Sequence, residues 1–407
     1  MAQQTAATQD DLKRLNRARL LQRLHATGAA TRSELVAFTG LNRSTIGSAV
    51  TELADAGLVV EHAGQPGQVG RPSLRVMPDP SSAVVVALDL RVDCTVAALV
   101  GLGGEVLART EQQHTRGYDP RAAVQSLVEL VSDLLSQAPS GAAWVGVGVG
   151  VPGTVDHPSG AVRSAPNLGW SHVPLAELLH ESLVDRLGGA PPIAVGNDAD
   201  LGAVAEHVRG CGVDCRNLIY VTADVGIGGG VIVDGRPLIG AGGLGGEVGH
   251  MVIDPRGSVC RCGARGCWET VVGRDAIGMR AGRPDDATEA VDVAEIVASA
   301  RQGDPTARSA VEETGEWLGI GLGNLVNILD PEVIVLGGHL RHLYPQVQEA
   351  VQGHIHRAMP ATRSQVWVTA PGLGGDSTLL GAAEVAFEGL LSDPVDVVDR
   401  SPRAVAS

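Results

Sequence analysis

One order of strands and helices occurs twice in this chain of 407 residues, and the second copy begins about 135 residues after the first. In each copy, an apolar run predicts a buried strand, a second strand follows across a turn, and a helix leads to a further strand. The predicted elements span residues 84–89, 94–100, 122–135 and 145–151 in the first copy, and 218–221, 228–233, 311–329 and 333–336 in the second. This repeat predicts two lobes of one α/β architecture with a ligand cleft between them.

A different pattern precedes the repeat. The expected helices span residues 12–26, 31–38 and 42–56, and the expected strands span 58–60 and 73–77 around a glycine-rich tip at 64–71. Thr31 and Glu34 form the capping-box pattern of the second helix, and Asn42 is placed to cap the third. Three helices followed by a two-stranded wing are typical of a winged helix-turn-helix domain.

The third helix of this segment is expected to enter the major groove of DNA, because recognition helices present their N-terminal residues to bases and phosphates. The polar side chains at that end are Asn42, Arg43, Ser44, Thr45 and Ser48. Arg71 at the wing tip is expected to reach a phosphate or the minor groove. The alternative is a three-helix module that binds another protein.

The charge is unevenly distributed. Residues 1–77 contain nine basic and six acidic side chains, whereas the whole chain carries a net charge of −15. A basic segment joined to an acidic body fits a DNA-binding module, although a chance excess of charge on a solvated helix is the alternative. No run of eighteen apolar residues is present and the first eleven residues are polar. We therefore expect a cytoplasmic protein without a membrane segment.

A compact group of metal-binding residue types lies in the second half of the chain. His250, Cys260, Cys262 and Cys267 supply three thiols and one imidazole, and glycine and arginine separate the cysteines. Three thiolates and one imidazole match a structural zinc site, in which four protein ligands leave no open position for water. A disulfide between two of these cysteines is the alternative, which a cytosolic location disfavours.

The motifs around this group strongly resemble the ROK family of repressors, open reading frames and kinases that act on or sense sugars. Residues 245–251 read Gly-Gly-Glu-Val-Gly-His-Met, and residues 260–269 read Cys-x-Cys-Gly-x-x-Gly-Cys-x-Glu. Further motifs of the family are Val-Pro-Gly at 151–153, Pro-Asn-Leu-Gly-Trp at 166–170, Asn-Asp-Ala at 197–199, and Asn-Ile-Leu-Asp-Pro at 327–331 with Gly-Gly at 337–338. The N-terminal segment and its Gly-Arg-Pro wing indicate the repressor branch.

The resemblance implies an α/β fold with an N-terminal winged helix-turn-helix and a two-lobed, duplicated actin-like or hexokinase-type (ribonuclease H-like) domain that carries a zinc loop. We expect a DNA-binding head at residues 1–78, an N-terminal lobe at 81–198, a C-terminal lobe at 199–390 and a flexible tail at 391–407. Repressors of this kind imply a palindromic DNA operator, a sugar or sugar-phosphate effector, and a homodimer or homotetramer.

The resemblance also assigns a sugar site. In the family, the hydroxyls of the sugar are held by residues that match Asn167, Asn197, Asp198, Glu247, His250 and Glu269. Amides and carboxylates both suit vicinal hydroxyls, which are donors and acceptors. His250 is expected to bind zinc through one ring nitrogen and to face the sugar with the other.

The phosphate loops depart from the pattern of the family's kinases, in which the residue at Asp198 is the general base. The first loop usually reads Asp-x-Gly-Gly-Thr, but residues 89–95 read Asp-Leu-Arg-Val-Asp-Cys-Thr. The second usually reads Thr-x-Gly-Thr-Gly, but residues 222–226 read Thr-Ala-Asp-Val-Gly, which places a carboxylate beside the expected triphosphate. Such a charge pair is repulsive by ~1 to 4 kcal/mol, so we expect no kinase activity.

Three functions follow from these observations. The first is a sugar-responsive DNA-binding regulator of carbohydrate uptake or metabolism genes, in which the sugar site controls the head. The second is an ATP-dependent sugar kinase with an appended DNA-binding domain, which Asp198 and Gly337-Gly338 favour. The third is a regulator that binds a partner protein and no small ligand.

Overall fold

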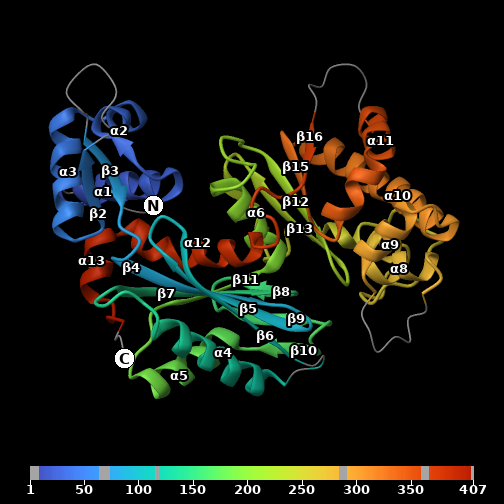
Figure 1. The fold of residues 1–407 in the computed structure, drawn as a ribbon, viewed down its shortest axis with the longest axis horizontal. Helices are drawn as coiled ribbons and strands as arrows, with labels where there is room; N and C mark the ends of the chain where they lie inside the picture. Colours follow the sequence, from blue (N-terminus) through green and yellow to red (C-terminus); the bar gives the residue numbers. More distant parts are fainter. Residues whose placement is uncertain are drawn as a thin grey trace, which may run out of the picture. The chain divides into compact units, whose positions relative to one another are not determined.

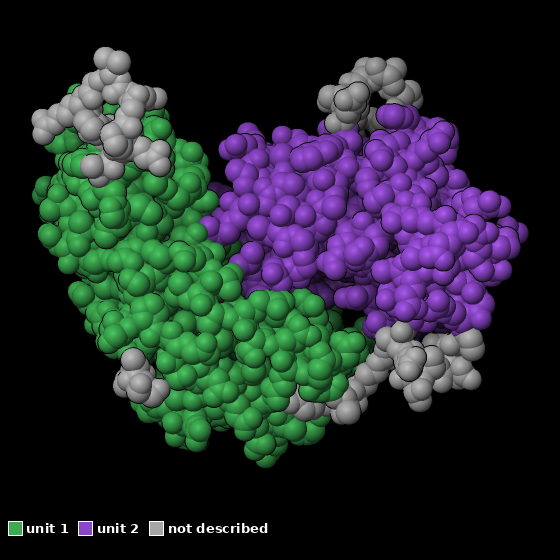
Figure 2. All heavy atoms as spheres, in the orientation of Figure 1, with its two compact units in different colours: residues 1–196, 382–407 green, residues 197–381 purple. Residues whose placement is uncertain are grey.

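The computed structural model describes residues 9–63, 74–114, 117, 119–283, 291–358 and 366–404 (Figure 1). The chain forms two compact units, which Figure 2 shows in different colours. Unit 1 comprises residues 1–196 and 382–407, and unit 2 comprises residues 197–381. The head therefore belongs to unit 1, and the chain re-enters unit 1 at residue 382, within the segment that we expected to be the C-terminal lobe.

The head begins with three helices in the predicted order: α1 (Gln9–Thr27), α2 (Arg32–Thr39) and α3 (Arg43–Asp55). The capping box of α2 is present, because the Glu34 N–H donates to Thr31 Oγ1 at 3.2 Å and the Thr31 N–H donates to Glu34 Oε2 at 2.6 Å. Gly40 ends α2 with φ of 71°, a conformation that glycine adopts at little cost. Both ends of this short helix are thus specified locally by its sequence.

A three-stranded antiparallel sheet completes the head, in the order β1 (Ala30–Thr31), β3 (Leu74–Pro78), β2 (Val59–Ala63). Strands β2 and β3 are the predicted strands of the wing. The predicted wing tip, including Arg71, lies outside the described residues. The core of the head is apolar and fully buried, and it includes Leu20, Leu24, Leu35, Ile46, Val50 and Leu53.

The main sheet of unit 1 has the strand order β11-β7-β4-β5-β6. Its strands are β4 (Ala83–Leu90), β5 (Cys94–Gly101), β6 (Glu105–Gln113), β7 (Ala143–Val151) and β11 (Ile193–Asn197). Strand β4 pairs antiparallel with β5 and parallel with β7, and helices α4 (Pro120–Leu135) and α5 (Leu175–Leu187) belong to the same apolar core. A second sheet consists of β8 (Thr154–Asp156), β9 (Ala161–Ala165) and β10 (Trp170–Val173).

Unit 2 repeats this topology with the order β16-β15-β12-β13-β14. Its strands are β12 (Leu218–Ala223), β13 (Ile227–Val233), β14 (Arg236–Pro237), β15 (Val333–Gly338) and β16 (Trp367–Thr369). As in unit 1, the central strand β12 pairs antiparallel with the next strand along the chain and parallel with a later one. The duplication predicted from the sequence is therefore present in the strand pairing.

Unit 2 also contains several helices (Figure 1). They are α6 (Asp198–Val208), α7 (Glu269–Val272), α8 (Arg274–Arg280), α9 (Val293–Arg301), α10 (Pro305–Leu329) and α11 (Leu340–Ala358), with a short 3₁₀ helix η1 (Val248–His250). Of these, α8 and α9 pack on α10 and α11 rather than on the sheet. Long helix α10 begins at the side-chain cap of Asp304, whose Oδ1 accepts from the Ala307 N–H at 2.7 Å. The buried side of α10 faces the apolar core beneath β12 and β15.

The chain ends in helices α12 (Ser377–Ser392) and α13 (Pro394–Arg400). Within unit 1, α12 lies directly on β7, since a Cβ added at Gly148 would stand 1.9 Å from the Ala382 carbonyl oxygen, and one at Gly146 would stand 2.3 Å from that of Ala386. The alternating glycines of β7 therefore allow the helix to approach the sheet backbone. The tail that we expected to be flexible instead contains α13, and the Ala404 N–H donates to the Ala142 carbonyl at 2.9 Å.

Candidate functional site

The four residues predicted to bind metal lie together in unit 2. His250 is the last residue of η1, and the three cysteines lie in the following loop. One ligand atom from each of His250, Cys260, Cys262 and Cys267 lies within 4.8 Å of all the others. Gly266 is required in this loop, because it has φ of 76° and a Cβ there would stand 1.6 Å from the Asp254 carbonyl oxygen.

The spacing of the ligand atoms matches tetrahedral coordination. A zinc ion with ordinary bond lengths separates two thiolate sulfurs by about 3.8 Å, and a sulfur from an imidazole nitrogen by about 3.6 Å. Cys262 Sγ lies 3.7 Å from Cys267 Sγ, and Cys260 Sγ lies 3.7 Å from His250 Nδ1. A disulfide needs sulfurs about 2.05 Å apart, and all three cysteines are free. The cluster can therefore hold a metal ion, with Nδ1 as the histidine ligand.

The thiols of the cluster differ in their surroundings. Burial raises the pKa of the Cys260 and Cys267 thiols, whereas a hydrogen bond from the Ala264 backbone lowers the pKa of the exposed Cys262 thiol. Metal binding requires all three as thiolates, and a bound cation favours that form.

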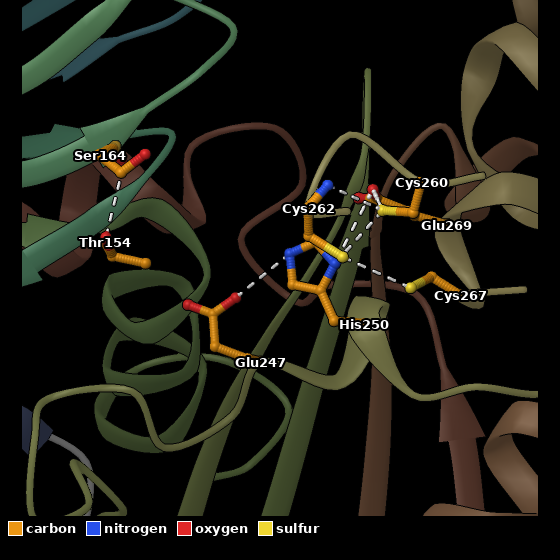
Figure 3. A network of polar contacts seen from close by, with 8 residues as sticks. All are labelled: Thr154, Ser164, Glu247, His250, Cys260, Cys262, Cys267 and Glu269. Atoms are coloured by element: carbon orange, nitrogen blue, oxygen red, sulfur yellow. Dashed lines mark hydrogen bonds and ion pairs between the residues drawn. The ribbon is translucent and has the colours of Figure 1, made fainter. Parts of the chain in front are cut away.

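His250 stands between two of the carboxylates assigned to the sugar site, as Figure 3 shows. Its Nε2 lies 3.8 Å from Glu247 Oε2, and its Nδ1 lies 3.8 Å from Glu269 Oε1. The Cys260 thiol donates to Glu269 Oε1 at 2.7 Å. The metal cluster and two of the predicted sugar ligands thus share the histidine: Nδ1 faces the sulfurs, and Nε2 faces Glu247.

Asn197 and Asp198 lie at the start of α6. Asn197 is the N-cap, and its Oδ1 accepts from the Ala199 N–H at 2.8 Å and the Asp200 N–H at 3.2 Å. Asp198 Oδ1 accepts from the Ala199 N–H at 2.9 Å, and a Cβ at Gly228 would stand 3.8 Å from it. Both side chains are held at the positive end of a helix, which favours negative charge.

Asp200 of α6 is a further carboxyl group near Glu247, and we did not predict it from the sequence. A Cβ added at Gly246, the residue before Glu247, would stand 3.9 Å from Asp200 Oδ1. Burial, and then the charge of Glu247, raise the pKa of Asp200 to about 7. Burial also raises the pKa of Glu247, although the charge of His250 lowers it in part. A carboxyl group that is half protonated near neutral pH can donate as well as accept a hydrogen bond.

Asn167 is the sixth residue assigned to the sugar site, and it belongs to unit 1. It lies in the turn at residues 166–169 between β9 and β10, where the Gly169 N–H donates to the Pro166 carbonyl at 3.2 Å. The other five residues belong to unit 2, in which contacts join Glu247, His250 and Glu269.

The two expected phosphate loops are both described. After β4, Arg91 donates from Nε to Oδ2 of the buried Asp89 at 2.7 Å, so this arginine is paired within its own loop. Between β12 and β13, the Asp224 N–H donates to the Gly226 carbonyl at 3.0 Å, and the Asp224 carbonyl accepts from the Arg274 N–H at 3.2 Å.

Five of the six residues predicted to contact DNA lie at the start of α3, and the sixth, Arg71, lies outside the described residues. Asn42 is its N-cap: Oδ1 accepts from the Thr45 N–H at 2.9 Å and from Ser44 Oγ at 2.7 Å. Asn42, Arg43, Ser44 and Ser48 are exposed, and Thr45 is half-buried. Ser48 Oγ donates to Glu52 Oε1 at 3.1 Å. An exposed helix N-terminus with an arginine is suited to a phosphate.

Comparisons with known proteins agree with this architecture. The model of the family described as "ROK family" matches residues 85–388. The "putative xylose repressor" of Caldicellulosiruptor sp. (strain Rt8B.4) is 28% identical over 396 residues, which cover 94% of this chain and 98% of the relative. The glucokinase of Streptomyces coelicolor is 31% identical over 288 residues, which cover 67% of this chain and 88% of the relative.

A solved structure extends the similarity over the head. The crystal structure of a ROK family transcriptional regulator, a homolog of the E. coli MLC protein, superposes with a TM-score of 0.77 and 25% identity, covering 95% of this chain and 99% of the other. Among the described residues, no helix is long and apolar enough to cross a membrane.

Proposed function

Because the chain belongs to the ROK family, we propose that it is a sugar-responsive DNA-binding repressor of carbohydrate uptake or metabolism genes. One observation carries this proposal: the similarity to a repressor covers 94% of the chain, whereas the similarity to a glucokinase covers 67%. The part of the chain that precedes the matched ROK residues contains the three helices and the sheet of the head.

In this proposal, the head at residues 1–78 is a winged helix-turn-helix domain that reads a palindromic operator as part of a homodimer or homotetramer. Helix α3 enters the major groove with Arg43, Ser44 and Ser48 toward bases or phosphates, and Arg71 acts from the wing. Asn42 and Thr45 lie at the same end of α3, and the hydrogen bond from the Thr45 N–H to Asn42 fixes where the helix begins. The assignment is supported by the exposed N-terminus of α3 and by the buried apolar side chains that hold the rest of this helix in the head.

The effector is a sugar or sugar phosphate, and we propose Asn167, Asn197, Asp198, Glu247, His250 and Glu269 as its ligands. The carboxylates accept from the hydroxyls, and the asparagine amides both donate and accept. The metal of the Cys3His cluster is zinc, which supplies a structural crosslink and fixes the tautomer of His250. With Nδ1 committed to the metal, Nε2 carries the proton and donates toward Glu247 or a sugar hydroxyl.

The alternative is an ATP-dependent sugar kinase, which the position of Asp198 and the similarity to glucokinases favour. The sequence of both phosphate loops weighs against it. Asp224 stands where a glycine is usual, and Arg91, whose charge would suit a phosphate, is paired with Asp89.

Selection of duplexes from a random library, followed by fluorescence anisotropy of the enriched sequence, tests the proposed function. We expect one sequence to be enriched and its affinity to change when D-xylose or D-glucose is added. Asp198→Asn should retain DNA affinity and lose most of the response to sugar, because the amide accepts hydroxyl donors less strongly than the carboxylate. Failure to enrich any duplex would count against a DNA-binding function.

A further inference from the structure

A buried polar contact joins the head to the rest of unit 1. His25, in the last turn of α1, is 1% exposed, and its Nε2 lies 3.2 Å from Oε2 of the buried Glu384 on α12. Its Nδ1 accepts from the Gly103 N–H at 2.9 Å, in the turn between β5 and β6. The Phe387 ring meets the imidazole edge to face, with ring centroids 4.9 Å apart. One side chain of the head thus contacts two separate elements of the sugar-kinase-like part.

The two hydrogen bonds fix the state of this histidine. Since Nδ1 accepts from a backbone N–H, the proton of the neutral ring lies on Nε2, which donates to the Glu384 carboxylate. Buried polar groups are costly unless they are paired. The pairing of His25 therefore specifies one position of α1, which apolar packing alone would not do. Two further contacts join α1 to this part of the chain: Gln22 Nε2 donates to the Leu391 carbonyl of α12 at 3.2 Å, and Arg14 pairs with Asp393, just after α12, at 3.8 Å.

The other end of α12 contacts the residues around the candidate sugar site. Within unit 2, Thr378 Oγ1 donates to the carbonyl oxygen of Asp198 at 3.0 Å, and Ser377 Oγ donates to Oε1 of Glu206 at 2.7 Å. Glu206 is fully buried on α6 and also accepts from the Gly372 and Leu373 N–H groups. The first turn of α12 is therefore bonded to α6, the helix that begins with Asp198.

Helix α12 is closely packed along its length. In unit 2, a Cβ at Gly381 would stand 1.9 Å from the Leu201 carbonyl of α6, and in unit 1 the glycines of β7 bring the same helix against the sheet backbone. Its first residues belong to unit 2, and its residues from Ala382 belong to unit 1. Packed backbones of this kind move as rigid elements between discrete arrangements rather than deforming continuously.

We propose that α12 is the coupling helix of this protein and that the His25–Glu384 pair is the contact through which it controls the position of the head. The Asp198 side chain binds the sugar, and the Asp198 carbonyl accepts the hydrogen bond from Thr378 at the start of α12. A shift of Asp198 on sugar binding therefore displaces α12, and with it Glu384, to which His25 of α1 is bonded. The inference rests on the proposed function. It assigns positioning roles to His25, Glu384 and Thr378, which act through other residues and are not proposed to contact DNA or sugar.

The test measures the coupling ratio, which is the dissociation constant for the enriched duplex with D-xylose or D-glucose divided by that without sugar. Allosteric effectors typically change affinity about 5- to 150-fold. In full-length His25→Ala and Glu384→Ala, we expect the ratio to move toward one while sugar affinity is retained. If the pair acts as a unit, the double variant brings the ratio no closer to one than either single variant. A ratio equal to that of the unmodified protein in all three variants would overturn the proposal.

The matched control is Arg17→Gln, on the same helix. Arg17 pairs with Glu52 of α3 at 2.6 Å, entirely within the head. It should leave the coupling ratio unchanged, although it also removes a polar contact of α1. A loss of coupling in this variant as large as in His25→Ala would show that any loosening of the head suffices, and would overturn the role of the His25–Glu384 pair.

Hydrogen exchange on the unmodified protein provides a test that does not depend on the folding of a variant. Addition of the sugar should change exchange in α12 at residues 382–392 and in α1 at residues 18–27, besides the changes at residues 197–200. Changes confined to unit 2, in a protein whose DNA affinity responds to sugar, would refute the coupling helix and leave the proposed function intact. A protein without any response of DNA binding to sugar would refute both.

Discussion

The sulfur atoms of Cys262 and Cys267 lie 3.7 Å apart, a distance too long for a disulfide and suited to two ligands of one tetrahedral ion. Cys262 is exposed, whereas Cys260 and Cys267 are buried. Replacement of Cys262 therefore removes one ligand of four with little direct loss of packing.

Cys262→Ser should lower the zinc content of the purified protein from one ion per chain to well below one, because a serine hydroxyl is a poor zinc ligand. The melting temperature should fall with it. Structural zinc contributes ~10–16 kcal/mol to the folding of small zinc domains, and we expect a smaller loss of several kcal/mol here, since unit 2 has its own apolar core. Elemental analysis and calorimetry measure the two effects.

Cys215→Ser is the matched control for this variant, since Cys215 is free and outside the cluster. It should retain the zinc content of the unmodified protein. Equal zinc content in Cys262→Ser and Cys215→Ser would contradict the assignment of Cys262 as a ligand.

The metal cluster and the duplicated sheet were predictable from sequence because both depend on local patterns. Cysteines within eight residues must lie close together, and apolar runs of strand length identify β4 and β12 without tertiary information. His25 was not predictable in this way. It follows a run of buried leucines in α1, and only the tertiary structure brings Glu384 to it from more than 350 positions along the chain.

Two roles were predicted for Asn42, of which the helix cap is confirmed and the DNA contact stays a prediction. The sequence indicated both a helix cap and a DNA contact, and the structure describes the cap, with Oδ1 bonded to the Thr45 N–H. The two roles can be separated by experiment because a cap contributes to stability in the absence of DNA.

Arg43→Ala should weaken binding of the enriched duplex, by about 1–3 kcal/mol if the guanidinium contacts a base and by a smaller amount if it contacts a phosphate. A lost phosphate contact also reduces the slope of log affinity against log salt concentration by about one. Anisotropy titrations at several salt concentrations distinguish the two. Arg19→Ala removes a charge that is also exposed, from α1, and it should change neither quantity. Equal losses in both variants would indicate a general effect of net charge.

The purified protein should release no ADP from ATP above background when D-xylose or D-glucose is present. The reason is the second phosphate loop, in which the Asp224 carboxylate would face a triphosphate, with a repulsion of ~1 to 4 kcal/mol for a charge pair at about 4 Å. The Streptomyces coelicolor glucokinase, assayed in parallel, provides the positive control. Sugar phosphorylation at a turnover near that of the control would show that the substituted loops still bind ATP.

Asp200→Asn should stabilise the protein at alkaline pH and have no effect at acid pH. Burial raises the pKa of Asp200 from 3.8 to about 7, so between these values the folded state binds more protons than the unfolded state, and stability falls as the pH rises. Asparagine removes this dependence. The gain should therefore be absent below pH 4, grow up to about pH 7 and then stay constant, with an upper limit of about 4 kcal/mol at 1.36 kcal/mol per pKa unit.

The melting temperatures of Asp200→Asn and of the unmodified protein, compared at each pH, measure this difference. Effects of pH on the metal cluster act on both proteins and cancel in the comparison. Glu34→Gln provides a control of opposite sign. The Thr31 backbone N–H lowers the pKa of Glu34, so the native carboxylate should favour folding at neutral pH and lose that advantage as the pH falls through its folded pKa. A stability difference between Asp200→Asn and the unmodified protein that does not change with pH would show that neither burial nor the charge of Glu247 raises the pKa of Asp200 in the folded state.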